Sequence, residues 1–386
     1  MKSKLSSRSR PRQQAGKNIS RREFIPRMMT AALGAGALLH SGMLLARQQA
    51  AATPPGTMKY RTLGKTGISI SEIGFGSHLT PQNMNDPQTR AAQIRGGLEL
   101  GINLFDVYEH GYHQFAPLSE VLEPVRQDVV LSLVTVWNRK QTMEEVEFAL
   151  ETFKTDVIDL YRIYWEPSMG RDEVEIRFQI LQQAKEEGKI RAVGLVSHDH
   201  AALTGILQSY PELDYLMLPY NFRHQRFSPV TAVQPVSWGR LKIGEVTSPS
   251  RKAAAAEVDC QYYPCPDSGL LPLVKETGVG LIAIKPFAGG GLLQLPFSDP
   301  LLEQLEGVEA SFPQAALRFV LQAREVGSVI PAMNSIGEVV ENAGAAQGDG
   351  LSAADIELLQ LYADAAEQAQ GIYLPDKYQW LEEWRA

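Results

Sequence analysis

The stretch "DVIDLYRIYW", residues 156–165, predicts a strand that is buried on both faces. Its apolar and aromatic side chains fall at odd and at even positions, whereas a strand with one solvent face would alternate with polar residues. Strands buried on both faces are typical of parallel sheets covered by helices. The segments "TMEEVEFALETFK" and "RDEVEIRFQILQQAKEEG" on either side of it have the spacing of amphipathic helices. An α/β fold with parallel strands is therefore indicated.

The same alternation of apolar runs and helical patterns continues along the chain. Strands are predicted at residues 72–77, 103–108, 128–136, 156–165, 192–197, 215–220, 280–287 and 328–333. Eight such units predict a (β/α)8 TIM barrel. Ahead of it, "YRTLGKTGISIS" predicts a β-hairpin that turns at Gly64-Lys65 and plugs the barrel bottom, and residues 351–370 predict an extra C-terminal helix. The alternative, a doubly wound sheet, would need a GxGxxG loop near its start, which is absent.

The first 52 residues have the character of an export signal. They carry ten Lys or Arg residues and one acid. The segment "SRREF", with Arg21 and Arg22, precedes a weakly apolar run from Met28 to Ala46, and small residues follow at 50–52. This resembles a twin-arginine (Tat) signal. We therefore expect residues 1–52 to be the signal and residues 58–386 the barrel. Export to the periplasm would make the Tat machinery a partner, with no stable membrane partner unless the signal stays uncleaved.

The rest of the chain is acidic, with 27 basic against 43 acidic side chains. Such a surface repels phosphate backbones, which excludes nucleic acid as the expected partner. Cys260 and Cys265 either pair or stay free, and their C-x4-C spacing matches no strong metal motif, so no metal is expected. Both lie in a long connection at about 222–268, rich in Pro, Ser and Gly, which is either functional or disordered.

Polar and aromatic residues gather where the predicted strands end. These include six of the seven histidines together with Asp106, Tyr108, Tyr112, Tyr164 and Lys285. Because the carboxyl ends of the strands form the active site of a TIM barrel, this end is the predicted functional mouth.

Six segments also occur in the order in which one family has them. They are "YRTLGKTGISISEIGFGS" (60–77), "GINLFDVY" (101–108), "TDVIDLYRIYW" (155–165), "KEEGKIRAVGLVSHD" (185–199), "IAIKPFAGGGLL" (282–293) and "SVIPAMNSIGEVVENAGA" (328–345). From Met58 to about Leu361 the chain resembles the aldo-keto reductases. "KPFAGG" and "SHD" are similar to a bacterial branch that often carries an iron–sulfur domain, but the cysteines for that cluster are lacking. The resemblance implies NADP(H) binding and carbonyl reduction.

The family's proton-transfer set is only partly matched. A Tyr donates the proton, a Lys cation lowers its pKa, an Asp holds the Lys, and a His stabilises the oxyanion. By resemblance, Asp106 matches the Asp and Tyr112 the Tyr, whereas the Lys position falls on Val134 and the His position on Tyr164. Without the Lys, Asp106 would act as a base or be neutralised by another cation. Tyr112, Tyr164 or a nearby histidine such as His198 would then supply the acid and base.

The resemblance also implies a nicotinamide site, with NADP and NAD both left open. The predicted cofactor-binding residues are Ser197, Lys285, Pro286, Phe287, Gly289, Asn334, Glu338, Glu341 and Asn342. Glu341 and Asn342 match contacts to adenine. Asn334 replaces the cation that grips the 2′-phosphate, which weakens the case for NADP over NAD.

Three functions remain open from the sequence. The first is an exported NAD(P)-dependent oxidoreductase acting on a small carbonyl or sugar-type substrate with a non-standard acid/base set. The second is a redox-inactive barrel that binds a small molecule or carbohydrate through aromatic residues such as Trp137, Trp165 and Trp238. The third is a cofactor-independent lyase or isomerase that uses Asp106 with His110 or His198.

Overall fold

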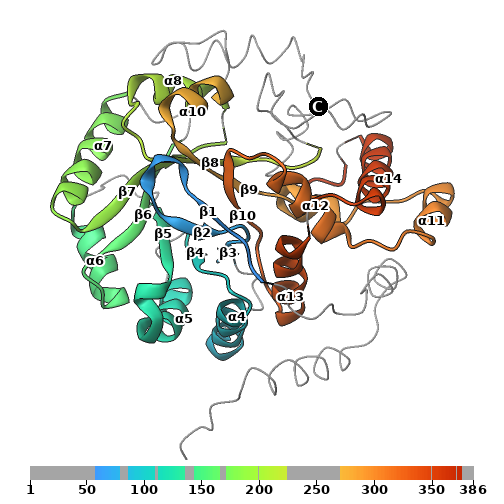
Figure 1. The fold of residues 1–386 in the computed structure, drawn as a ribbon, viewed down its shortest axis with the longest axis horizontal. Coiled ribbons are helices and arrows are strands. Elements are labelled where there is room, and N and C mark those ends of the chain that lie inside the picture. The colour runs from blue at the N-terminus through green and yellow to red at the C-terminus, as the bar shows by residue number, and fades with distance from the viewer. Residues whose placement is uncertain are drawn as a thin grey trace, which may run out of the picture. The chain divides into compact units, whose positions relative to one another are not determined.

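The computed structural model describes residues 57–78, 86–108, 112–134, 143–165, 171–198, 200–223, 270–348, 350–370 and 372–375. Their centre is one parallel sheet of eight strands in the order β10-β9-β8-β7-β6-β5-β4-β3 (Figure 1). Parallel bridges join Ile73 to Val329 and Gly76 to Ala332, and so link the two ends of the sheet. The sheet closes into a barrel, and the prediction of a (β/α)8 fold is confirmed.

The strands lie within the predicted segments or overlap them. They are β3 (Phe75–Gly76), β4 (Leu104–Asp106), β5 (Val130–Val134), β6 (Ile158–Tyr164), β7 (Ile190–Val196), β8 (Tyr215–Pro219), β9 (Gly280–Ile284) and β10 (Val326–Ile330). Strand β6, the core of the stretch quoted first, is buried at every position but its last. The reading of that stretch as a strand with two buried faces is therefore confirmed.

Helices surround the sheet (Figure 1). They are α4 (Pro87–Glu99), α5 (Tyr112–Leu122), α6 (Met143–Phe153), α7 (Arg171–Glu186), α8 (His200–Ser209), α10 (Leu270–Thr277), α11 (Asp299–Leu305), α12 (Phe312–Leu321), α13 (Ile336–Gly344) and α14 (Ala353–Ala369). Helix α14 confirms the extra C-terminal helix, and it begins at a capping box between Ser352 and Asp355. Among the described residues, no helix combines the length and apolarity needed to cross a membrane.

The predicted hairpin is formed by β1 (Tyr60–Thr62) and β2 (Ser69–Ser71), with the 3-10 turn η1 (Gly64–Thr66) between them. Its apolar side chains pack against the inward-facing side chains of the strands near their amino ends. This inner cluster includes Leu63, Ile68, Ile70, Leu104, Val130, Leu160 and Ala192. Gly64 has a φ of +46° and lies so near Gly280 that a Cβ would come within 2.3 Å of its backbone nitrogen. Only glycine fits there, and the hairpin closes the barrel bottom as predicted.

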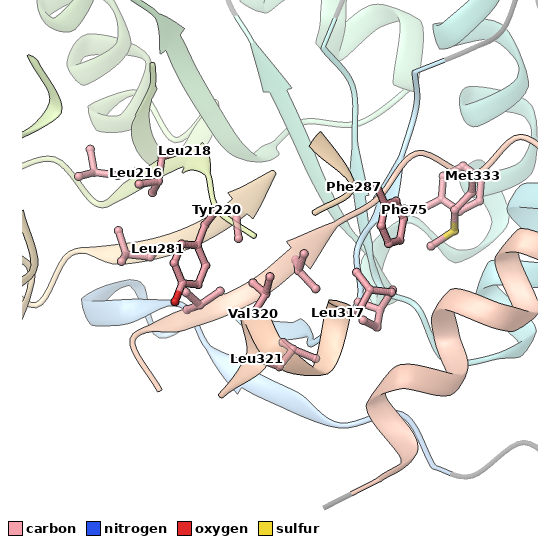
Figure 2. Close-up of a cluster of buried hydrophobic side chains, with 14 of the residues drawn as sticks. Phe75, Leu216, Leu218, Tyr220, Leu281, Phe287, Leu317, Val320, Leu321 and Met333 are labelled. Carbon is pink, nitrogen blue, oxygen red and sulfur yellow. The ribbon is translucent and has the colours of Figure 1, made fainter. Parts of the chain in front are cut away.

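A second apolar layer lies between the strands and the outer helices. Figure 2 shows part of it, in which Leu216 and Leu218 on β8 and Leu281 on β9 belong to the same buried cluster as Leu317, Val320 and Leu321 on α12. Each fully buried side chain of this size contributes about 1.5–3 kcal/mol relative to an exposed one. This layer fixes the strands against the helices, so that the strand ends at the mouth are held on rigid elements.

Three earlier predictions fall on residues outside the described ranges. They are the signal at 1–52, the long connection at about 222–268 apart from its first two residues, and the pairing of Cys260 with Cys265.

Candidate active site

The barrel interior contains a buried ion pair between strands β4 and β6. The Arg162 guanidinium donates from Nη1 to Asp106 Oδ1 at 2.7 Å and from Nη2 to Asp106 Oδ2 at 3.3 Å. Their side chains are 2% and 7% exposed. Asp106 is the last residue of β4, so its carboxylate lies toward the carboxyl-terminal end of the barrel. The predicted catalytic aspartate is thus held by a cation from two strands away.

Ser132 on β5 completes this network. Its hydroxyl donates to Asp106 Oδ1 at 2.7 Å and accepts from Arg162 Nη1 at 2.8 Å. Asp106 and Ser132 are register partners across β4 and β5. Arginine, aspartate and serine therefore form a closed triangle of charge-assisted hydrogen bonds, which are stronger than bonds between neutral groups.

A tyrosine from the far side of the barrel approaches the same network. The Tyr215 hydroxyl on β8 lies near Arg162 and Ser132 but makes no well-aligned hydrogen bond among the described residues. Burial raises the pKa of this hydroxyl, and the Arg162 cation partly offsets that effect. Its ring fills the space beside Gly194, where a Cβ would meet it at 2.3 Å. Gly194 is thus needed to admit the ring.

Arg162 is the functional candidate that the sequence reading missed. An arginine inside a strand predicted to be buried on both faces was the available signal, since charged residues are almost never fully buried without a partner. Residue 162 shares the inward parity of Tyr164, two positions later. Both carboxylate oxygens of Asp106 accept hydrogen bonds from Arg162, which is the arrangement expected if another cation neutralises Asp106.

The mouth above this network is lined by aromatic side chains. Tyr164, at the end of β6, packs edge-on against His198 with ring centroids 6.1 Å apart. Burial and, to a smaller extent, the Lys285 cation lower the pKa of His198 to about 3. His198 is therefore neutral at physiological pH. The structure brings these three predicted residues together at the ends of β6, β7 and β9.

Two other tyrosines, Tyr108 and Tyr112, follow Asp106 in the chain. Tyr108, beyond the end of β4, stacks on His78 with centroids 6.0 Å apart. Tyr112 is the first residue of α5, which follows β4 in the chain. Both follow Asp106 within one β/α unit, as the resemblance requires.

The loop after β9 carries several of the predicted cofactor residues. Lys285 and Ala288 have φ values of 55° and 49°, and Gly289 and Gly290 have 68° and 96°. A left-handed conformation costs about 1–2 kcal/mol at a non-glycine residue and often marks functional sites. Asn221 donates from Nδ2 to the Lys285 carbonyl at 3.1 Å and holds this turn. Pro286 and Phe287 are buried beneath it, whereas Gly289 is exposed.

The start of α13 carries the second group of predicted cofactor residues. Glu338 is exposed, and its Oε2 accepts from the Asn334 amide at 2.8 Å, while Ser335 caps the helix through the Glu338 amide. The carboxylate of Glu338 is thereby held at the helix start, where it repels a further phosphate. Glu341 accepts a hydrogen bond from the Ser311 hydroxyl and Asn342 is buried.

Helix α4 holds the loop that leads into α13. Arg90 donates to the Met333 carbonyl, and to the Gly76 carbonyl at 3.0 Å, and it lies 4.6 Å from the centre of the Phe75 ring. Gln93 donates to the Asn334 carbonyl at 2.8 Å. These contacts fix the loop on the barrel. The strained turn after β9 with its lysine and the helix start at α13 fit a dinucleotide, since backbone amides and one cation suit a pyrophosphate.

Ser197, the remaining predicted contact, is buried just after β7, and its amide donates to the Met217 carbonyl at 3.3 Å. It adjoins His198 at the same edge of the barrel. Within the described ranges, no three His, Cys, Asp or Glu side chains are grouped so as to hold a metal ion.

Known proteins resemble this chain. The profile of the Aldo/keto reductase family matches residues 72–231. Aldo-keto reductase YhdN of Bacillus subtilis is 30% identical over 182 residues, which are 42% of this chain and 54%, about half, of that relative. L-galactose dehydrogenase of Arabidopsis thaliana is 22% identical over 351 residues, 83% of this chain and 96% of that protein. The apo structure of an aldo-keto reductase from Bacillus halodurans has a TM-score of 0.55 and 22% identity over 83% of this chain and 99% of its own, a likeness of fold.

Proposed function

We propose that this chain is a nicotinamide-dependent oxidoreductase of the aldo-keto reductase type, acting on a small carbonyl or sugar-type substrate. The match to the family profile over residues 72–231 and the similarity to YhdN support this proposal. The observation that carries the proposal is the position of the Asp106–Arg162 pair. It lies beneath a mouth lined by Tyr164, His198 and Lys285, at the end of the barrel where enzymes of this fold bind their substrates. A relative that is named as an L-galactose dehydrogenase supports a sugar-type substrate.

The chemistry needs a hydride and a proton. A bound reduced nicotinamide would supply the hydride to the carbonyl carbon. The residues of this chain must deliver the proton to the carbonyl oxygen, so that the C=O bond becomes C–H and O–H. A tyrosine hydroxyl at the mouth can donate that proton and regain one from water. His198 is neutral, so it orients the substrate as a hydrogen-bonding group and brings no charge.

The proposed cofactor site spans the turn after β9 and the start of α13. Lys285 would contact the pyrophosphate, and the exposed Gly289 and the uncrowded Gly290 would let the phosphate oxygens approach the backbone. The exposed Glu338 carboxylate at the helix start disfavours an additional phosphate on the ribose. We therefore expect NADH to bind at least as tightly as NADPH.

Calorimetric titration with NADH and with NADPH tests the cofactor assignment. Lys285→Ala should weaken both ligands about tenfold or more, equivalent to about 1.4 kcal/mol. Lys275→Ala is the matched control, because Lys275 is a half-exposed lysine on α10 paired with Glu325. If neither NADH nor NADPH gives a heat of binding, the proposal is contradicted. Turnover of aldehydes, ketones and aldoses, followed by nicotinamide absorbance, then defines the substrate class.

Export through the Tat route belongs to the same proposal and is supported by Arg21, Arg22 and the apolar run that follows them. A Tat substrate is exported folded, so a nucleotide could be loaded before export. Arg21→Lys with Arg22→Lys should leave the protein in the cytoplasm of an exporting host. Unchanged fractionation of that variant would remove the export claim and leave the enzymatic one.

A further inference from the structure

Arg162 provides a charge that the sequence reading found missing. We propose that Arg162 supplies the positive charge of the candidate active site, in place of a lysine at position 134, and that it acts as a positioning residue through Asp106. This inference rests on the proposed function and deepens it, because it names the group on which the ionisation of the site depends.

The register of the strands is the first support. Val134 and Arg162 are direct partners across β5 and β6, and both face the barrel interior. A cationic side chain at position 134 or at position 162 would therefore enter the barrel interior from adjacent positions on neighbouring strands. From β6 the side chain must cross β5 to reach Asp106 on β4. An arginine is long enough to do so, and it retains two hydrogen bonds to the carboxylate at the end of that reach.

The environment of Asp106 is the second support. The described residues bond its carboxylate only through side chains, namely the guanidinium of Arg162 and the hydroxyl of Ser132. Removing one partner of a buried pair leaves an uncompensated charge and costs about 3–5 kcal/mol. The apolar Val134 is therefore compatible with a buried Asp106 because Arg162 carries the compensating charge.

The third support is the position of the Asp106–Arg162 pair, because its charges affect the pKa of a tyrosine at the mouth. An unpaired carboxylate below the mouth would hold the proton of a neighbouring tyrosine, because a nearby negative charge disfavours the tyrosinate. A guanidinium bonded to both carboxylate oxygens cancels that field. Arg162 also lies near the Tyr215 hydroxyl on β8, and its positive charge lowers the pKa of that hydroxyl as well. The pair thus sets the electrostatic potential under the reacting groups without touching the substrate.

The test removes the positive charge at position 162 on β6 and then restores it at position 134 on β5. Arg162→Met should lower kcat about 10²–10³-fold, the usual cost of one electrostatic group, and should leave the dissociation constant of NADH within about threefold. Arg162→Lys should recover part of the loss. The double variant Arg162→Leu/Val134→Lys should recover kcat to within about tenfold of wild type and restore the wild-type pH profile of kcat.

Arg126→Met is the matched control. Arg126 also forms a buried pair with an aspartate, Asp159, at 2.8 Å, but this pair lies on the other side of the barrel wall. Its loss should lower the melting temperature while kcat and its pH profile stay unchanged. The inference is overturned if Arg162→Met behaves like this control. It is also overturned if the double variant folds, binds NADH as wild type does and stays as inactive as Arg162→Met.

Failure of the proposed function has a different signature. Wild-type protein that binds no nucleotide, or binds it and turns over no aldehyde, ketone or aldose, overturns the function itself and the inference that rests on it. Wild-type turnover combined with a failed charge relocation overturns the inference alone.

Discussion

Strand β6 carries two buried charged residues that serve different ends. Asp159 and Arg162 are three positions apart, so their side chains leave the strand on opposite faces. Asp159 is bonded by Arg126 at 2.8 Å and by Arg191 at 2.7 Å, and it also accepts from the Leu131 amide at 3.0 Å. Arg162 instead turns into the barrel and meets Asp106 and Ser132.

The Asp159 site and the Asp106–Arg162–Ser132 site differ in the groups that their hydrogen bonds connect. Arg126 also donates to the carbonyls of Val129 and Val157, so the outer site fastens backbone segments to each other. The inner triangle is made almost entirely of side chains and lies below the mouth. A charged site bonded to backbone favours a structural role, whereas one bonded to side chains beneath a mouth favours a role in binding or chemistry.

The sharpest way to break this comparison is to neutralise each aspartate in turn. Asp106→Asn should lower kcat/KM about 10²–10³-fold, because Arg162 loses its counter-charge below the reacting groups. Asp159→Asn should lower the free energy of unfolding by about 3–5 kcal/mol and leave kcat/KM of the folded protein unchanged. Urea unfolding and steady-state kinetics on both variants give the two readouts. Equal losses of activity in both would erase the distinction.

Lowering the pH should reduce the free energy of unfolding because His198 is neutral in the folded protein. The folded pKa of His198 is about 3, below its ordinary 6.5, so between these values the unfolded chain binds a proton that the folded chain does not. Stability is therefore lost as the pH falls below about 6.5, by up to about 1.4 kcal/mol per pH unit. Unfolding of wild type and His198→Asn at about pH 7 and about pH 5 measures this.

The wild type should lose about 2 kcal/mol more than His198→Asn over that range. Identical pH dependence in the two proteins would mean that His198 is solvated and charged in the folded state.

Removing the third member of the inner triangle should have a smaller effect. Ser132→Ala deletes one hydrogen bond to Asp106 and one from Arg162, which costs about 1–2 kcal/mol of stability and a few-fold in kcat. Ser119→Ala is the control, since its hydroxyl donates to the Thr152 carbonyl outside the barrel at 2.6 Å. Thermal melts and kcat values separate the two. A change of kcat in Ser119→Ala as large as in Ser132→Ala would contradict the assignment.

The smallest effect on stability is expected for Arg191, the more exposed of the two arginines that pair with Asp159. The Arg191 side chain is 49% exposed, so its pair with Asp159 is screened by water. Arg191→Met should change the free energy of unfolding by less than about 1 kcal/mol. A loss comparable to that of Arg126→Met, measured by urea unfolding, would show that exposure does not rank these pairs.

The fold could be predicted because each strand is specified locally. Apolar runs such as the one in β6 require cover on both faces, and eight of them in alternation with helices leave one common solution. The turn at Gly64 and the extra helix α14 also carried local signals. Strand ends differed by a few residues, as at β9, because Lys285 leaves the strand in a left-handed conformation that no apolar pattern encodes.

The site was only partly predictable because it depends on register and reach. Asp106, Tyr164, His198 and Lys285 lie at or just beyond the ends of their strands, and strand ends can be located from sequence. The ion pair of Arg162 with Asp106 joins residues 56 positions apart. It follows from the pairing of β4, β5 and β6, which no single stretch contains.

A pair of double-mutant cycles on kcat/KM tests the central claim most directly. One cycle combines Asp106→Asn with Arg162→Met, and the other combines Asp159→Asn with Arg126→Met. The account predicts a coupling energy of about 2 kcal/mol or more between Asp106 and Arg162, and less than about 0.5 kcal/mol between Asp159 and Arg126. Equal coupling in the two cycles, or none between Asp106 and Arg162 in folded protein that binds nucleotide, would contradict it.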